Sequence, residues 1–188
     1  MASLVLVFVT LGLFMQGYFL AGIAVGFVMT FLDTVDGKLA RVTLTSSRWG
    51  NRFDHSIDLI HPPFWYAAWW YGLHAAGLAD TVPYLDVALG IIMVGYVVGR
   101  MEEHFFNKLF GIQIHTWRPI DSFFRLITAR RNPNIAILML AALVGRPDIG
   151  FLLLALWTLI SVIFHGVRLI QAAMRGEDRL QSWLMEPA

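Results

Sequence analysis

The sequence contains no cysteine, and charged residues make up only 14% of its 188 residues. The absence of cysteine excludes a disulfide framework, a thiol nucleophile and a zinc site with cysteine ligands. Soluble domains usually carry about 25% charged residues, so roughly half of the usual charge is missing. The formal net charge is +1, which gives no reason to expect a nucleic-acid partner.

Hydrophobic residues, by contrast, are abundant. They make up 57% of the chain, and the mean hydropathy is +0.63. Seven tryptophans and fourteen phenylalanines exclude a disordered chain, because disordered segments lack this much apolar material. The composition therefore predicts an integral membrane protein, with residues 1–188 forming a single transmembrane domain.

The apolar residues form stretches that predict membrane-spanning helices, each of which needs about 20 predominantly apolar residues. Residues 2–32 carry no charge, and the polar break Gln16-Gly17-Tyr18 predicts a tight turn between a short first helix and a second helix. We therefore expect an all-α membrane bundle of six transmembrane helices, the first incomplete and the fifth short. The other apolar stretches are residues 59–78, 87–98 (extendable as helix to 106), 135–144 and 149–164.

The positions of lysine and arginine predict the orientation of these helices. If the helices alternate in direction, residues 33–58, 100–133 and 165–188 lie on one side of the membrane. This side receives thirteen of the fourteen Lys and Arg residues, and the other side receives only Arg146. The positive-inside rule makes the charged side cytoplasmic. We therefore expect a multi-pass protein whose polar stretch 33–58 faces the cytoplasm.

Four aspartates flank this polar stretch. Asp33 and Asp36 are three residues apart, and Asp54 and Asp58 are four residues apart, so each pair lies on one face of its helix. Four carboxylates close together repel one another, and divalent cations relieve the repulsion. All-oxygen ligands suit Mg²⁺, Mn²⁺ or Ca²⁺, and two such ions can clamp a phosphoryl group during transfer.

The neighbouring residues suit a phosphorylated ligand. Gly37 directly follows Asp36 and allows a ligand to approach the backbone closely. Arg41 can present its guanidinium group to a phosphate. Gly50 allows the second helix to start close to the first.

The pattern Asp33-x-x-Asp36-Gly37-x-x-Ala40-Arg41, eight residues, Gly50-x-x-x-Asp54-x-x-x-Asp58 resembles the signature of the CDP-alcohol phosphotransferase family at every fixed position. The resemblance implies transfer of a substituted phosphate from a CDP-linked donor to an alcohol acceptor, with release of CMP. It implies two divalent cations, Mg²⁺ or Mn²⁺, bound by Asp33, Asp36, Asp54 and Asp58. It also implies that Asp58 is the catalytic base and that the donor contacts Gly37, Ala40, Arg41, Gly50 and, less directly, Ser47.

The chain departs from the family pattern at its beginning. Family members have an amphipathic helix and a complete first span before the motif, whereas this sequence starts inside that span. We therefore expect a domain truncated at its N-terminus or excised from a longer protein. Some members are fused to a soluble cytidylyltransferase, and dimers are common in the family.

The segment 100–133 is mixed and basic, with Pro119 and Pro133 as helix breakers. Its arginines have two interpretations: they reflect the positive-inside bias alone, or they bind an anionic acceptor such as a sugar or polyol phosphate. Glu102 and Glu103 are expected to pair with arginines of this segment. The candidate acceptor residues are Arg118, Arg125, Arg130, Arg131 and, near the end of the last helix, Arg168.

Two other functions are compatible with the same residues. A divalent-cation transporter would use the four aspartates as its ion site, although transporter sites lie near the membrane midplane rather than at one edge. A catalytically silent membrane anchor for a fused soluble domain is the third reading. The sequence leaves open which alcohol is the acceptor and whether the donor is a lipid.

Overall fold

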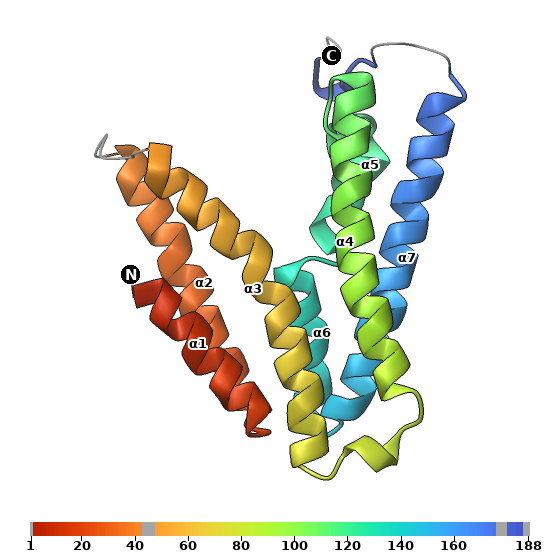
Figure 1. Cartoon of the computed structure of the whole chain (residues 1–188). Coiled ribbons are helices and arrows are strands. Elements are labelled where there is room, and N and C mark those ends of the chain that lie inside the picture. The colour runs from red at the N-terminus through yellow and green to blue at the C-terminus, as the bar shows by residue number, and fades with distance from the viewer. Residues whose placement is uncertain (1, 43–47, 176–179, 186–188) are drawn as a thin grey trace. The chain divides into compact units, whose positions relative to one another are not determined.

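The computed structural model describes residues 2–42, 48–175 and 180–185; for residues 2–3, 33–34, 36–42 and 48–58 it describes the backbone alone. Within these ranges the chain is helical and contains no strand, which confirms the all-α class. The α-helices are α1 (Ala2–Met15), α2 (Phe19–Val42), α3 (Arg48–Ala75), α4 (Leu85–Phe110), α5 (Pro119–Ile127), α6 (Arg131–Leu143) and α7 (Pro147–Ala173) (Figure 1). Short 3-10 helices are η1 (Ala79–Thr81), η2 (Ile114–Thr116) and η3 (Trp183–Met185).

One described helix, α7, is by itself long and apolar enough to cross a membrane. Parts of α1 and α2 are apolar but shorter, over Leu4–Met15 and Phe19–Leu32. The number of six membrane-spanning helices therefore stays a prediction.

The chain divides into two compact units. Unit 1 contains Met1–Leu89 and Leu138–Phe151, and unit 2 contains Gly90–Ile137 and Leu152–Ala188. The predicted single domain of residues 1–188 is not tested by this division and stays a prediction.

In unit 1, the predicted turn between the first two helices is confirmed. Helix α1 ends at Met15, α2 begins at Phe19, and Gly17 lies between them with a φ of 77°. The N–H of Gly17 donates to the carbonyl of Phe14 (3.0 Å), and the N–H of Tyr18 to that of Leu13 (2.9 Å). Glycine adopts a positive φ without the steric cost that a Cβ brings, so the sequence can end α1 sharply here.

Helix α1 packs against both α2 and α3. The indole N–H of Trp65 on α3 donates to the carbonyl of Val7 on α1 (3.1 Å). Gly72 on α3 lies so close to the end of α1 that a Cβ there would collide with the carbonyl of Phe14. The end of α3 therefore lies beside the α1–α2 turn.

The aromatic run 64–71 is sorted by the helical period. Trp65 and Trp69 are buried at 2% and 0% exposure, whereas Phe64 and Tyr71 are half exposed. Residues four apart lie on one face of a helix, so Trp65 and Trp69 point together into unit 1.

In unit 2, the segment predicted as a basic loop is largely helical. Helix α4 continues to Phe110, and α5 occupies Pro119–Ile127. Proline at the first position favours a helix start, and the backbone N–H of Arg118 donates to the Asp121 carboxylate (3.1 Å) as part of a capping box. The prolines thus start helices rather than break them: Pro133 lies in the first turn of α6.

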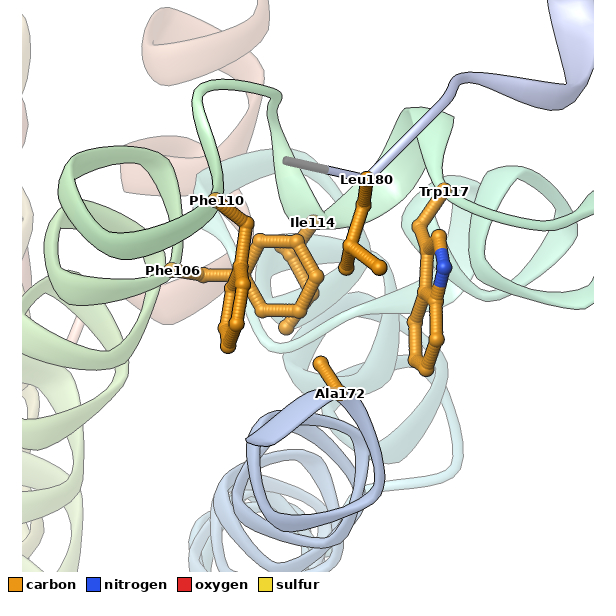
Figure 2. Packing of buried hydrophobic residues seen from close by; sticks show 6 residues of the cluster. All are labelled: Phe106, Phe110, Ile114, Trp117, Ala172 and Leu180. Atoms are coloured by element: carbon orange, nitrogen blue, oxygen red, sulfur yellow. The ribbon is translucent and has the colours of Figure 1, made fainter. Parts of the chain in front are cut away.

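An apolar cluster closes the end of unit 2 where α4 and α7 finish. Figure 2 shows Phe106 and Phe110 of α4 with Ala172 of α7 and Leu180 of the C-terminal segment. The Ser182 hydroxyl donates to the carbonyl of Thr116 (2.7 Å). The C-terminal segment is therefore held against the connection between α4 and α5. The remaining members of the cluster are Ile114 and Trp117.

Candidate active site

The motif residues lie on two consecutive helices. Helix α2 does not end at the aspartates but continues to Val42, since residues 37–42 include alanine, leucine, lysine and arginine, which are good helix formers. Helix α3 begins at Arg48. The polar stretch 33–58 is therefore helical where it is described. Asp33, Asp36, Gly37, Ala40 and Arg41 lie on α2, Gly50, Asp54 and Asp58 lie on α3, and Ser47 lies outside the described residues.

Helices α2 and α3 are antiparallel and touch along a defined seam. The ring centroids of Phe19 on α2 and Trp69 on α3 are 4.5 Å apart. Further along, a Cβ built on Gly26 of α2 would lie 3.4 Å from the ring of Trp65 on α3. As the residue number rises on α2, the number of its partner falls on α3.

The aspartate positions continue this seam toward the connection between the helices. Asp33 follows Gly26 by seven residues, and Asp58 precedes Trp65 by seven residues. Seven residues are nearly two helical turns, so on α2 the position of Asp33 returns to the face of Gly26 within about 20°. On α3 the same spacing relates Asp58 to Trp65 across Pro62 and Pro63. The backbone therefore brings the positions of Asp33 and Asp58 to the same seam.

Distance from the helix ends places the four positions at two levels. Asp36 lies six residues before Val42, and Asp54 lies six residues after Arg48, which is about 9 Å along each helix. Asp33 and Asp58 lie nine and ten residues from the same ends. The two levels are Asp36 with Asp54 and, deeper, Asp33 with Asp58.

The sequence predicts no role for two residues of α3 near Asp58, namely Pro62 and His61. Pro62 has no N–H to donate to the carbonyl of Asp58 four residues earlier, so the helical ladder is interrupted beside the proposed base. His61 is buried, with its ring centroid 4.7 Å from that of Trp65. The three-residue spacing from Asp58 to His61 could have indicated that the two residues are neighbours, because residues three apart share a helix face.

The candidate acceptor arginines do not form one site. Arg168 is 8% exposed and binds the buried Asp121 through two contacts, from Nε to Oδ1 (2.5 Å) and from Nη2 to Oδ2 (2.7 Å). Its guanidinium also lies 4.3 Å from the centroid of the Trp117 ring, where Arg118 lies at 5.1 Å. Arg118 and Arg168 are thus brought together on Trp117.

A second group surrounds Glu103. Its carboxylate pairs with Arg130 and, at 3.3 Å, with Arg100, which confirms the expected pairing for this glutamate. The group borders a cavity of about 20 Å³ that Ser161 and His165 also line. A volume of this size holds about one water molecule. Of the other two candidates, Arg125 is exposed on α5 and Arg131 begins α6.

Among the residues whose side chains are described, no three His, Asp or Glu side chains gather in a way that could hold a metal ion. The aspartates of the seam are not among those residues. Their donor set consists of carboxylate oxygens alone, which fits a hard divalent cation.

Sequence comparison decides the family. The family model described as CDP-alcohol phosphatidyltransferase matches residues 1–129, which include the whole α2–α3 seam. The chain belongs to this family. CDP-alcohol phosphatidyltransferases generally depend on divalent cations and are membrane proteins, and membership supports phospholipid head-group transfer.

A curated relative supports the same assignment. The chain is 28% identical over 169 residues to archaetidylinositol phosphate synthase from Pyrococcus horikoshii. The matched region covers 89% of this chain and 75% of the relative. The similarity to this relative therefore extends beyond the motif and reaches into α6 and α7.

Proposed function

We propose that the protein is a membrane transferase that moves a substituted phosphate group from a CDP-linked donor, CDP-diacylglycerol or another CDP-alcohol, to an alcohol acceptor. The observation that carries this proposal is the α2–α3 seam, which brings four aspartate positions to two matching levels on antiparallel helices. Family membership supports the reaction class.

The residues of the sequence motif divide into a donor group and an acceptor group. Gly37, Ala40, Arg41, Ser47 and Gly50 contact the nucleotide and diphosphate of the donor. Asp58 takes the proton of the acceptor hydroxyl, the oxygen attacks the donor phosphorus that carries the substituent, and the bond to CMP breaks. CMP leaves with the electron pair of that bond, so charge and atoms balance.

The aspartates Asp33, Asp36, Asp54 and Asp58 would hold two divalent cations, Mg²⁺ or Mn²⁺. When bound, such ions balance the negative charge on the diphosphate and on the attacking oxygen. The chain's own task is to keep the two helices in register, and the packing of the buried Trp65 and Trp69 and the close approach at Gly26 support this register.

The name of the relative from Pyrococcus horikoshii indicates a lipid product that carries inositol phosphate. We therefore propose a lipid-linked CDP donor and an inositol phosphate as the first substrates to assay. Arg125 is the candidate acceptor residue to test first, because it is exposed, whereas Arg130 and Arg168 bind Glu103 and Asp121.

We propose six membrane crossings in one domain, with the seam at the cytoplasmic side. The chain has no cysteine, so single introduced cysteines report the topology directly. A cysteine in place of the exposed Asp80 should react with an impermeant maleimide from outside the cell. One in place of Lys108 should react only after permeabilisation, and outside labelling at Lys108 would contradict the orientation.

The reaction is tested by CMP release from the CDP-linked donor, with and without Mg²⁺ or Mn²⁺. Asp33→Asn and Asp54→Asn should abolish release and weaken divalent-ion binding, since each variant loses an anionic oxygen ligand. Asp80→Asn, outside the seam, is the matched control and should keep the parental rate. A transporter would bind the ions without releasing CMP, and a silent anchor would do neither; both results would contradict the proposal.

A further inference from the structure

In unit 2, α5 runs antiparallel along α7 rather than away from it. Contacts between the two helices form a regular series in which the residue number rises on α5 and falls on α7. The series is Asp121 with Arg168, Phe124 stacked on Phe164 with centroids 3.8 Å apart, and the carbonyl of Ile127 with the indole N–H of Trp157 (2.6 Å).

Helix α6 continues beside the same helix. In unit 2, Ile137 and Trp157 line a common groove, and in unit 1 the Cβ of Ala141 lies 2.5 Å from where a Cβ on Gly150 would stand. Pro119–Leu143, the stretch from α5 to α6, is therefore long enough for one crossing, which needs about 20 residues. Only the break at residues 128–130 interrupts it.

This break lies near the middle of α7. Trp157 is ten residues from Pro147, or about 15 Å along the helix, and sixteen residues from Ala173. Non-helical backbone at membrane depth is tolerated only where protein or trapped water satisfies its polar groups. Here the N–H of Ala129 donates to the hydroxyl of Ser161 (3.0 Å), and Arg130 pairs with Glu103.

The exposed residues of α5 are apolar apart from Arg125. The inner face of the helix carries Asp121, which is 3% exposed. Helix α7 exposes Ile160, Ile163 and Val167 between the levels of Trp157 and Arg168, so α7 is also apolar and exposed at the depth that α5 occupies. The outer face of α5 consists of Ile120 (56% exposed), Phe123 (70%), Leu126 (73%) and Ile127 (50%).

We propose that α5 and α6 form a single, broken membrane crossing, and that the outer face of α5 and the adjoining groove contact lipid acyl chains. The groove has a volume of about 600 Å³ and is lined mainly by apolar side chains, among them Leu126, Ile137 and Trp157. Soluble proteins rarely expose a large, continuous apolar surface to water. The inference rests on the membrane placement proposed above and not on the reaction.

The test uses single cysteines labelled with an environment-sensitive fluorophore, in the full chain reconstituted into phosphatidylcholine–phosphatidylglycerol vesicles. Phe123→Cys probes α5, Ile163→Cys is the matched position on α7, and the exposed Gln181→Cys is the water control. We expect brominated acyl chains to quench the labels at 123 and 163 equally. Aqueous iodide should quench only the label at 181.

Three results would overturn the inference. If iodide quenches position 123 and brominated lipid quenches 163, α5 lies in water while the membrane placement of α7 stands. If brominated lipid quenches neither, the membrane placement itself fails. If neither quencher acts on the label at 123, but brominated lipid quenches it once the protein is diluted in excess lipid, a second copy of the chain covers α5. Leu126→Cys repeats the measurement should Phe123→Cys fail to fold, and CMP release is scored separately in every variant.

Discussion

Replacing Arg168 by alanine should lower the thermal stability of the protein more than replacing any other arginine whose side chain the structure describes. Arg168 makes two charge-assisted contacts to Asp121, donates to Gln171 (2.5 Å) and lies over the Trp117 ring. Removing one partner of a buried ion pair leaves an uncompensated charge and costs about 3–5 kcal/mol. For a chain of this size, each kcal/mol of lost stability lowers the melting temperature by about 2–4 °C. The loss of Arg168 should therefore lower the melting temperature by roughly 6–20 °C.

The assay is thermal unfolding in detergent, followed by circular dichroism. Arg175→Ala is the matched control, because the Arg175 guanidinium lies 5.6 Å from the centroid of the same Trp117 ring but is exposed. Its loss should cost at most about 1 kcal/mol. Equal melting temperatures for Arg168→Ala and the parent would refute the structural role of this ion pair.

A double variant separates stability from acceptor binding. A buried ion pair can often be replaced by uncharged side chains of similar size without loss of stability. Asp121→Asn with Arg168→Met should therefore recover most of the stability that Arg168→Ala loses, together with the parental KM for the acceptor. If stability returns but the acceptor KM stays raised, Arg168 binds the acceptor and our interpretation is wrong.

Two further predictions concern pH and helix packing. Burial, with help from Arg125, lowers the pKa of His115 to about 4, so the unfolded chain binds a proton that the folded chain does not. Stability should therefore fall by up to about 3 kcal/mol as the pH drops from about 6.5 to 4, and His115→Gln should flatten this dependence in pH-resolved melts. Gly95→Ala on α4 should cost about 1–3 kcal/mol, because its Cβ would lie 2.5 Å from Cγ2 of Thr158 on α7. Gly99→Ala on the same helix meets nothing within 4 Å and should be neutral or stabilising by up to about 1 kcal/mol; equal losses in the two variants would contradict the close approach.

The sequence predicted those features that depend on local chemistry. The turn at Gly17 follows from a glycine between two apolar stretches, and the structure confirms it. The spacing of the aspartates predicted two faces, and the backbone of α2 and α3 adds the register that brings these faces to one seam. The family assignment from the same motif is confirmed.

The features that the sequence did not reveal depend on tertiary contacts. The segment 100–133 carries enough arginine to suggest a loop in water, yet its Arg130 pairs with Glu103 of α4, and its Asp121 pairs with Arg168 of α7. Composition counts charges but not their partners, so α5 was missed. Its signal was the apolar spacing of Ile120, Phe123 and Ile127 after a proline.

We propose that the α2–α3 seam performs the transfer with Asp58 as the base. The most direct measurement is CMP release by Asp58→Asn, combined with calorimetric titration of the CDP-linked donor. Because asparagine keeps the shape but cannot take the proton, the variant should bind the donor nearly as well as the parent. It should release CMP about 10²–10⁴ times more slowly. Release of CMP at the parental rate by donor-saturated Asp58→Asn would contradict the claim and place the base elsewhere.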